Sequence, residues 1–192
     1  MDAHLAEVKY MLRIPLGRKR VAGDSLYRKE DNMERILVLS DSHGNVENMI
    51  EAVNNTEPDR MIHLGDCFAD ARKLHKKFPE IPMAQVPGNC DWDDGPTEQI
   101  LEIEGIKILI CHGHTYNVKS SYLSIEMGAL EQEVDIALFG HTHQVFYDYH
   151  NGIRLMNPGS IGAPRWGNPP SYGILTVDGE TETVEMEIEY LE

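Results

Sequence analysis

The 192-residue chain has few cysteines, little positive charge and no long hydrophobic run. Its three cysteines, Cys67, Cys90 and Cys111, form no Cys-x-x-Cys pair, and this odd count without a repeating framework predicts reduced thiols in a cytoplasmic protein. No apolar stretch reaches the roughly 18 residues of a transmembrane helix. The N-terminus has no apolar segment followed by a small-residue cleavage site, so neither a membrane span nor a secretory signal is expected.

Basic residues are scarce: 17 Lys and Arg stand against 32 Asp and Glu, which gives a net charge of −15. Nonspecific nucleic-acid binding needs basic patches, and anionic membranes attract basic segments, so both kinds of partner are disfavoured. An acidic protein can still act on an anionic substrate if bound cations reverse the local field. The length and a hydrophobic fraction of 41% fit one domain with a substantial core.

The first 32 residues differ in charge from the rest. They carry seven basic and five acidic residues, a net of +2, which leaves −17 for residues 33–192. Because Met33 stands just before the first apolar run, we interpret residues 1–32 as an N-terminal extension or a misassigned start, poorly ordered on its own. Residues 33–192 are then the folded domain, and a functional basic arm is the alternative interpretation of the extension.

Five short apolar runs each stop abruptly at a cluster of Asp, Asn, His and Gly residues. Short apolar runs bounded by glycine indicate buried strands. Polar clusters at the same end of the strands of one sheet converge at its rim, where open α/β sheets bind ligands. The five runs are residues 36–39, 61–64, 83–87, 108–110 and 136–139. Five such clusters make a metal site the leading hypothesis.

Helical spacing alternates with the early runs, and strands dominate the end of the chain. Apolar residues repeat at helical intervals over 46–53, with Asn45 as the expected N-cap, and further helices are expected over 69–78 and 123–134. The remaining strands are expected at residues 99–103, 107–110, 145–149, 153–156, 172–177 and 184–190. This order predicts an α/β fold in which two sheets pack together with helices outside.

Side chains able to bind metal recur in the clusters. Asp41 and His43 are two positions apart, as are His141 and His143, and in extended backbone this spacing places both side chains on one side. Carboxylate and imidazole together suit Mn, Fe, Zn, Co or Ni rather than calcium. The seven candidate ligands are Asp41, His43, Asp66, Asn89, His112, His141 and His143. Seven suits two ions about 3.5–4 Å apart rather than one tetrahedral ion.

Each of these residues alone has a more ordinary interpretation. An Asp after a strand commonly caps a helix, an Asn after glycine commonly forms a turn, and a single His commonly belongs to the core or surface. Their joint occurrence at five strand ends favours the metal centre. We expect His63 to be structural and His4, His75 and His150 to lie at the surface. For His114, substrate contact and support of the ligands stay open.

The ordered motifs resemble the calcineurin-like metallophosphoesterase superfamily. They are Asp-x-His at 41–43, Gly-Asp at 65–66, Gly-Asn-x-Asp at 88–91, His-Gly-His at 112–114 and Gly-His-x-His at 140–143. The small size and the Asn-Pro-Gly-Ser-Ile-Gly-Ala-Pro-Arg segment at 157–165 resemble the small stand-alone phosphodiesterase branch of bacteria and archaea. The resemblance covers residues 41–165 and leaves out residues 1–32.

This resemblance implies a four-layer α-β-β-α sandwich, two mixed sheets with helices outside, and two metals at one edge of the sheets. One metal would bind Asp41, His43, Asp66 and His143, and the other Asp66, Asn89, His112 and His141, so that Asp66 bridges them. The implied activity is hydrolysis of a small phosphoester by in-line attack of a metal-bridging hydroxide. Mn²⁺ is the leading metal, with Ni, Fe, Zn or Co as alternatives.

One position departs from the family pattern. Many members have Gly-Asn-His-Asp, in which the His is the usual proton donor to the leaving oxygen, whereas this chain has Cys90. A thiol with an ordinary pKa near 8.5 is a poor general acid at neutral pH. We therefore expect a good leaving group, or protonation by another residue, with His114 the leading candidate. Arg165 is a candidate phosphate contact, with a solvent or interface role as its alternative.

Other functions on this fold remain in competition. A phosphomonoesterase or nucleotide phosphatase would use the same dinuclear core. A non-catalytic interaction module, like the retromer subunit of this fold, is expected to have lost metal ligands, and all seven survive here. A nuclease is disfavoured by the charge of −17 over residues 33–192. A small phosphoester is thus the expected partner, and the sequence leaves a homo-oligomer open.

Overall fold

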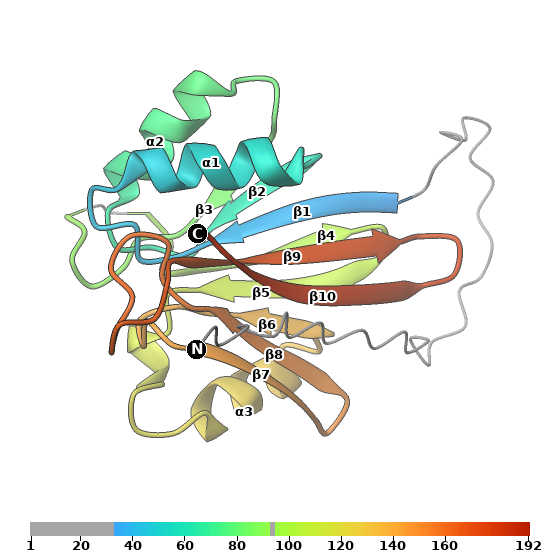
Figure 1. Cartoon of the computed structure of the whole chain (residues 1–192). Coiled ribbons are helices and arrows are strands. Elements are labelled where there is room, and N and C mark those ends of the chain that lie inside the picture. The colour runs from blue at the N-terminus through green and yellow to red at the C-terminus, as the bar shows by residue number, and fades with distance from the viewer. Residues whose placement is uncertain (1–32, 93–94) are drawn as a thin grey trace, which may run out of the picture.

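The computed structural model describes residues 33–92 and 95–192, so the predicted N-terminal extension lies outside the described residues. The described residues form two five-stranded mixed sheets (Figure 1). The first sheet has the order β10 (Thr183–Tyr190), β9 (Ser171–Asp178), β1 (Met33–Leu39), β2 (Arg60–His63), β3 (Met83–Gln85). The second has the order β4 (Glu98–Ile103), β5 (Ile106–Cys111), β6 (Ile136–Leu138), β8 (Ile153–Pro158), β7 (Val145–His150).

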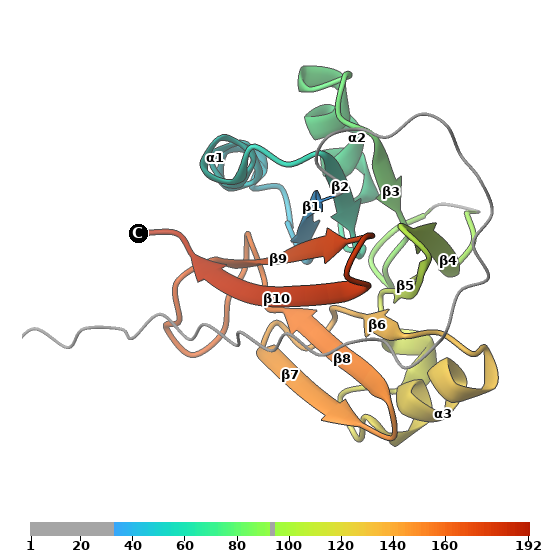
Figure 2. The same ribbon diagram turned by 90° about the vertical axis from the view of Figure 1, so that its right-hand side faces the viewer.

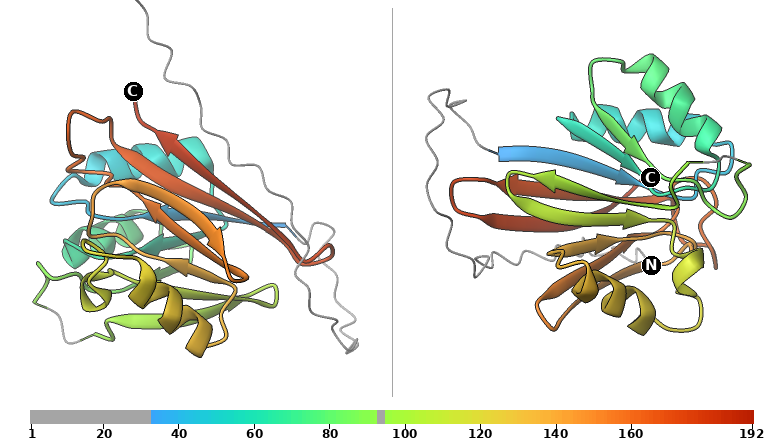
Figure 3. Two further views of the ribbon diagram at one scale, coloured as in Figure 1. Left: turned by 90° about the horizontal axis from the view of Figure 1, so that it is seen from below. Right: turned by 180° about the vertical axis from the view of Figure 1, so that it is seen from behind.

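Helices cover the outer faces of the two sheets, as Figures 2 and 3 show. Helices α1 (Val46–Thr56) and α2 (Phe68–Lys77) lie on the first sheet, and α3 (Leu123–Glu131) lies on the second. One buried apolar cluster fills the space between the sheets, and two others join each sheet to its helices. The molecule is therefore the four-layer α-β-β-α sandwich that the motifs implied.

Local signals set the ends of α1. The side chain of Asn45 accepts a hydrogen bond from the Asn48 amide at 3.2 Å, which is the predicted N-cap. The helix ends where Glu57 adopts a left-handed φ of 47° and its amide bonds back to the Val53 carbonyl. Met49, Ala52 and Val53 form the buried face.

The prediction of a third helix over 123–134 was wrong at its end. Helix α3 stops at Glu131, and Glu133 turns the chain with a φ of 52°. Val134 is buried, and its amide donates to the carbonyl of Ala129. Val134 fits the helical spacing because its side chain is buried on the same side as the helix, but its backbone belongs to the turn that follows.

The five polar clusters lie on two sheets, not on the rim of one. Strands β1, β2 and β3 run parallel in the first sheet, and β5 and β6 run parallel in the second. Their carboxyl ends meet where the sheets approach each other: the ring of His112, after β5, contacts the carbonyl of Leu64, after β2, at 2.8 Å. The second sheet therefore supplies three of the seven candidate ligands, His112, His141 and His143. Among the described helices, none is long and apolar enough to cross a membrane.

Candidate metal centre

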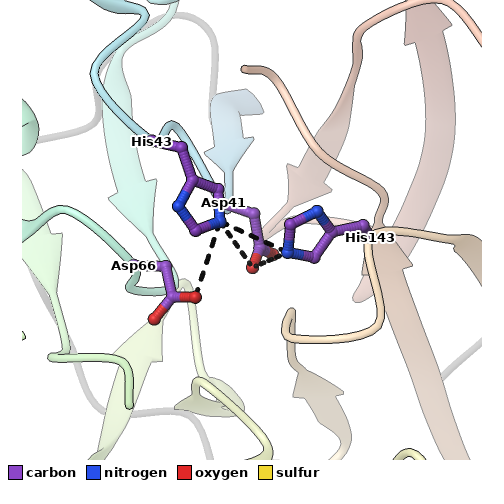
Figure 4. Close-up of side chains that lie close together, drawn as sticks. All are labelled: Asp41, His43, Asp66 and His143. Carbon is purple, nitrogen blue, oxygen red and sulfur yellow. Dashed lines mark hydrogen bonds and ion pairs between the residues drawn. The ribbon is translucent and has the colours of Figure 1, made fainter. Parts of the chain in front are cut away.

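Four predicted ligands form one compact group in the space between the strand ends (Figure 4). Asp41, His43, Asp66 and His143 each offer one ligand atom, and these atoms all lie within 4.8 Å of one another. The Nε2 of His143 lies 3.1 Å from Asp41 Oδ1 and 3.3 Å from the Nε2 of His43. Asp66 Oδ2 lies 3.6 Å from the Nε2 of His43. These are the residues that the resemblance assigns to one metal.

The hydrogen bonds around this group leave the facing atoms available to a cation. Asp41 is buried, and its Oδ2 accepts bonds from the Ser40 hydroxyl at 2.6 Å and the His141 amide at 3.0 Å. Its Oδ1 is buried without a hydrogen-bond partner, a costly state for a carboxylate oxygen. His143 Nδ1 donates to the Ala163 carbonyl at 2.6 Å, which leaves the Nε2 lone pair for a metal. The group therefore fits a divalent cation.

A second group surrounds His112 on the other side of Asp66. The Nε2 of His112 lies 3.3 Å from Asp66 Oδ1. It also lies 3.2 Å from Asn89 Oδ1 and 3.2 Å from His141 Nδ1. Its Nδ1 donates to the Leu64 carbonyl at 2.8 Å, so again one ring nitrogen is fixed by backbone and the other faces the site. All seven candidate ligands thus lie in two adjacent groups, and the two oxygens of Asp66 face one group each.

Two of these residues, Asp66 and His141, have the charge that metal binding needs at neutral pH, whereas in the His112 ring the effect of burial is outweighed by the bond to Asp66, which raises the pKa of that ring. Burial alone would raise the pKa of Asp66, but the bonds from His112 and the Cys90 amide outweigh it and hold the pKa well below its usual range. Burial lowers the pKa of His141 to about 4, helped by the charges of His112 and Lys119. Asp66 is therefore ionised and His141 neutral at pH 7, the forms in which they bind metal.

The backbone of five of the seven candidate ligands is left-handed, which corrects the expectation of extended backbone at the two i, i+2 pairs. The positive φ values are 54° at Asp41, 44° at His43, 58° at Asp66, 69° at His141 and 58° at His143. This conformation costs a non-glycine residue about 1–2 kcal/mol, and such strain concentrates at functional sites. The paired side chains converge because tight turns aim them at one point, not because alternate strand residues share a face.

The segment that resembles the small phosphodiesterases supports these turns. Asn157 donates its amide hydrogens to the Gly140 carbonyl at 2.7 Å and the Thr142 hydroxyl at 3.0 Å, which holds the turn that carries His141 and His143. The Ser160 hydroxyl donates to the Asp41 carbonyl at 2.8 Å. The role of this segment is therefore to fix two ligand turns against each other.

A buried polar network behind the site was not found from the sequence. Asp70 of α2, 2% exposed, accepts bonds through Oδ2 from the Ser42 hydroxyl at 3.1 Å and the Gly44 amide at 2.7 Å. His63 is buried, contacts the Ser42 hydroxyl at 3.3 Å and accepts from the Gly65 amide, a structural position as expected. Asp70 gave no signal because an acid in the first turn of a helix is ordinary.

Asp91 joins the loop after β3 to the start of α2. Its Oδ1 accepts from the amides of Cys67 at 3.0 Å and Phe68 at 2.8 Å, and its Oδ2 accepts from the Gly88 amide at 2.8 Å. Gly88 has no room for a side chain, because a Cβ would collide with Asp66. Asp91, the last residue of the Gly-Asn-x-Asp motif, therefore holds the loop of Asn89 in place against Asp66.

Cys90 and His114, the two candidate proton donors, both lie at the centre. The Cys90 amide donates to Asp66 Oδ1 at 3.1 Å, and burial together with Asp66 raises the pKa of the exposed thiol. The His114 ring lies 5.5 Å from that of His112 and 6.1 Å from that of His141, between centroids. Burial and the charge of His112 lower the pKa of His114, and its Nδ1 is buried without a partner.

The remaining candidates divide between the site and the packing. Arg165 is exposed on the His143 side, where its charge opposes protonation of that ring. Trp92 and Trp166 are exposed. Tyr116 donates its hydroxyl to Glu98 at 2.6 Å and packs on α3 at Gly128, which is a packing role. Lys119, which the sequence did not single out, lies 3.4 Å from His141 Nδ1.

The fold and the group of Asp and His side chains that could hold a metal ion fit a metal-dependent phosphoesterase. Residues 34–180 match the sequence model of the calcineurin-like phosphoesterase superfamily domain, and the chain belongs to this family. It is 37% identical over 153 residues to the probable metallophosphoesterase YsnB of Bacillus subtilis, over 78% of this chain and 88% of YsnB.

Two further proteins are similar to the chain, one in sequence and one in structure. It is 28% identical over 173 residues to the phosphodiesterase YfcE of Escherichia coli, over 76% of this chain and 89% of YfcE. Its structure is similar to that of Vacuolar Protein Sorting 29 from Cryptosporidium parvum, with a TM-score of 0.66 over 84% of this chain and 100% of that one. At 19% identity this second likeness shows the fold alone.

Proposed function

We propose that the protein is a phosphodiesterase that binds two divalent metal ions and hydrolyses a small phosphoester in the cytoplasm. The observation that carries this proposal is the position of Asp66, whose Oδ1 faces His112 at 3.3 Å and whose Oδ2 faces His43 at 3.6 Å. A carboxylate between two ligand groups can serve both ions. The name of YfcE supports the diester substrate, and three free cysteines support the location.

The donor atoms favour a transition metal in both positions. Asp41, His43 and His143 would hold one ion, Asn89, His112 and His141 the other, and Asp66 both. Mixed carboxylate, amide and imidazole donors suit Mn²⁺, with Ni, Fe, Zn or Co as competitors. When bound, such a pair supplies an activated water and stabilises charge on the phosphoryl oxygens.

The residues beside the ligands would orient the phosphoester and limit which leaving groups depart. Arg165 would bind a phosphoryl oxygen, a role supported by its exposure and by the effect of its charge on His143. The Cys90 thiol keeps its proton but is a weak acid, and His114 has a lowered pKa and is mostly neutral at pH 7. Neither is a strong proton donor, so substrates whose leaving oxygen needs little protonation should react best.

The test is hydrolysis of an aryl phosphodiester and the matching aryl monoester, with added Mn²⁺ and with chelator. We expect metal-dependent cleavage that favours the diester. A preference for the monoester would favour a phosphatase with the same site. If the protein binds metal but hydrolyses neither substrate, the result would favour a non-catalytic binding role.

The substitution Asp66→Asn removes the charge shared by the two groups. We expect it to lower turnover by more than the roughly 100-fold that changes outside the direct ligands cost, with the fold intact by circular dichroism. Asp148→Asn, at an exposed position of β7, is the control and should retain full activity. Normal turnover with two bound ions in the Asp66 variant would contradict the shared-ligand assignment.

A further inference from the structure

Lys119 places a positive charge at the edge of the second ligand group. It lies in the turn that follows the short 3₁₀ helix His114–Tyr116, and its side chain is exposed. Its Nζ lies 3.4 Å from Nδ1 of His141, the same atom that lies 3.2 Å from Nε2 of His112. Within residues 33–92 and 95–192, no carboxylate forms an ion pair with Lys119.

An ammonium in this position needs an anionic partner once the centre is loaded. Like charges a few ångströms apart repel, and the repulsion is stronger beside a buried site than in bulk water. The neighbour that Lys119 has in the protein, the His141 ring, carries no negative charge that could pair with the ammonium. An anionic oxygen that touches both the ammonium and the metal centre would remove the repulsion.

We propose that Lys119 binds a nonbridging oxygen of the phosphoryl group, on the His112–His141 side of the centre, and contributes more to binding a doubly charged phosphoryl group, such as inorganic phosphate or a monoester, than to binding the singly charged diester. This inference rests on the proposed function and extends it to substrate charge. Arg165 is close enough to His143 for its charge to oppose protonation of that ring, whereas Lys119 contacts His141, so each of the two exposed cations acts on a different ligand group. Both stand out in a chain whose net charge is −15.

The first test measures binding, using inorganic phosphate and Mn²⁺ as probes. In Lys119→Met we expect the affinity of the Mn²⁺-loaded protein for phosphate to fall by about tenfold, the low end of the range for a charge-assisted hydrogen bond because the site is exposed. The affinity of the metal-free protein for Mn²⁺ should stay equal or rise, because a repelling charge has gone. Lys119→Arg should retain most of the phosphate affinity.

A fall in phosphate affinity without a fall in Mn²⁺ affinity separates this role from a structural one. A variant that has lost Mn²⁺ and phosphate affinity together would overturn the proposal, as would unchanged phosphate affinity. The control is Lys76→Met, an exposed lysine near the end of α2, where both affinities should match those of the unmodified protein.

The second test measures charge selectivity by steady-state kinetics. Lys119→Met should lower kcat/KM for an aryl monoester more than for the matching aryl diester, because the monoester carries the additional charge. An equal loss on both would overturn the selective role. If the unmodified protein binds Mn²⁺ and phosphate but cleaves neither ester, the proposed function fails while the binding test of Lys119 still decides this inference.

Discussion

Two of the candidate ligand imidazoles, His112 and His143, donate their Nδ1 hydrogens to the carbonyls of Leu64 and Ala163. In the neutral ring, each bond selects the tautomer in which Nε2 has a free lone pair, and it also fixes the direction of that lone pair. Neither carbonyl can be recognised in the sequence, because any residue supplies one. The sequence therefore shows which residues can bind a metal, whereas the orientation of their side chains is set by backbone carbonyls that only the fold brings close to them.

Cys90 is the residue whose chemistry departs most from the family pattern, and replacing it tests the proton donor. We expect Cys90→His to raise kcat/KM on alkyl phosphodiesters by up to about 100-fold, the lower end of what general acid catalysis contributes. Aryl phosphodiesters, which leave without much protonation, should gain little. The measurement is a pair of Michaelis–Menten series on one alkyl and one aryl diester.

Cys90→Ala is the matched control, since it removes the thiol without adding an acid, and it should change neither rate strongly. Equal gains on alkyl and aryl substrates in Cys90→His would contradict a role in protonating the leaving group.

The first turn of α2 ties three ligand-bearing loops together at the scale of the element. Asp70 accepts from Ser42 and Gly44 in the loop after β1, and Asp91, in the loop after β3, accepts from the first amides of α2. Asp66 lies directly before this helix. A shift of α2 would therefore move ligands from β1, β2 and β3 together.

Asp70 offers a way to loosen this arrangement without touching a ligand. In Asp70→Asn one acceptor oxygen remains but the charge is lost, so the bonds from Ser42 and Gly44 weaken. We expect affinity for Mn²⁺ to fall by about 10- to 100-fold, as for other residues that support metal ligands. Isothermal titration of metal-free protein measures the change.

Lys73→Met is the control for this experiment. It removes only the Lys73–Asp70 ion pair, whose lysine side chain is 63% exposed, and exposed pairs contribute little. Mn²⁺ affinity in this variant should match that of the unmodified protein. Unchanged affinity in Asp70→Asn would show that the network does not position the ligands.

The sequence predicts elements well where one local pattern decides them. Apolar runs located β1, β2, β5 and β6, and Asn45 located the start of α1. Prediction from the sequence failed where distant parts of the chain come into contact. Val134 fits a helix by spacing but lies in a turn. The left-handed backbone of five of the seven candidate ligands could not be recognised from the presence of Asp or His alone. Asp70 and Lys119 stayed unnoticed because an acid or a base on a surface helix or turn is common until tertiary contacts give it a partner.

The candidate centre lies where the ends of the two sheets approach each other, so metal binding there should affect the stability of the whole domain. Asp41, His43 and Asp66 follow strands of the first sheet, whereas His112 and His141 follow strands of the second. Metal-free, the centre brings two carboxylates and several imidazoles together on left-handed backbone, which opposes folding. Bound cations would offset this cost and hold the ends of the two sheets together.

Metal removal should therefore lower the stability of the entire domain. A metal present at 100 times its Kd stabilises the folded state by about 2.7 kcal/mol for each site. For a chain of this length each kcal/mol shifts Tm by about 2–4 °C, so chelation should lower Tm by roughly 5–10 °C for each ion lost. Thermal unfolding followed by circular dichroism, with Mn²⁺ and with chelator, gives this difference.

Asp66→Asn, which weakens both groups, should show a much smaller difference in Tm between the two conditions. Equal Tm values for the unmodified protein would mean that no cation joins the sheets, because ligands drawn from both of them cannot bind tightly without stabilising their contact.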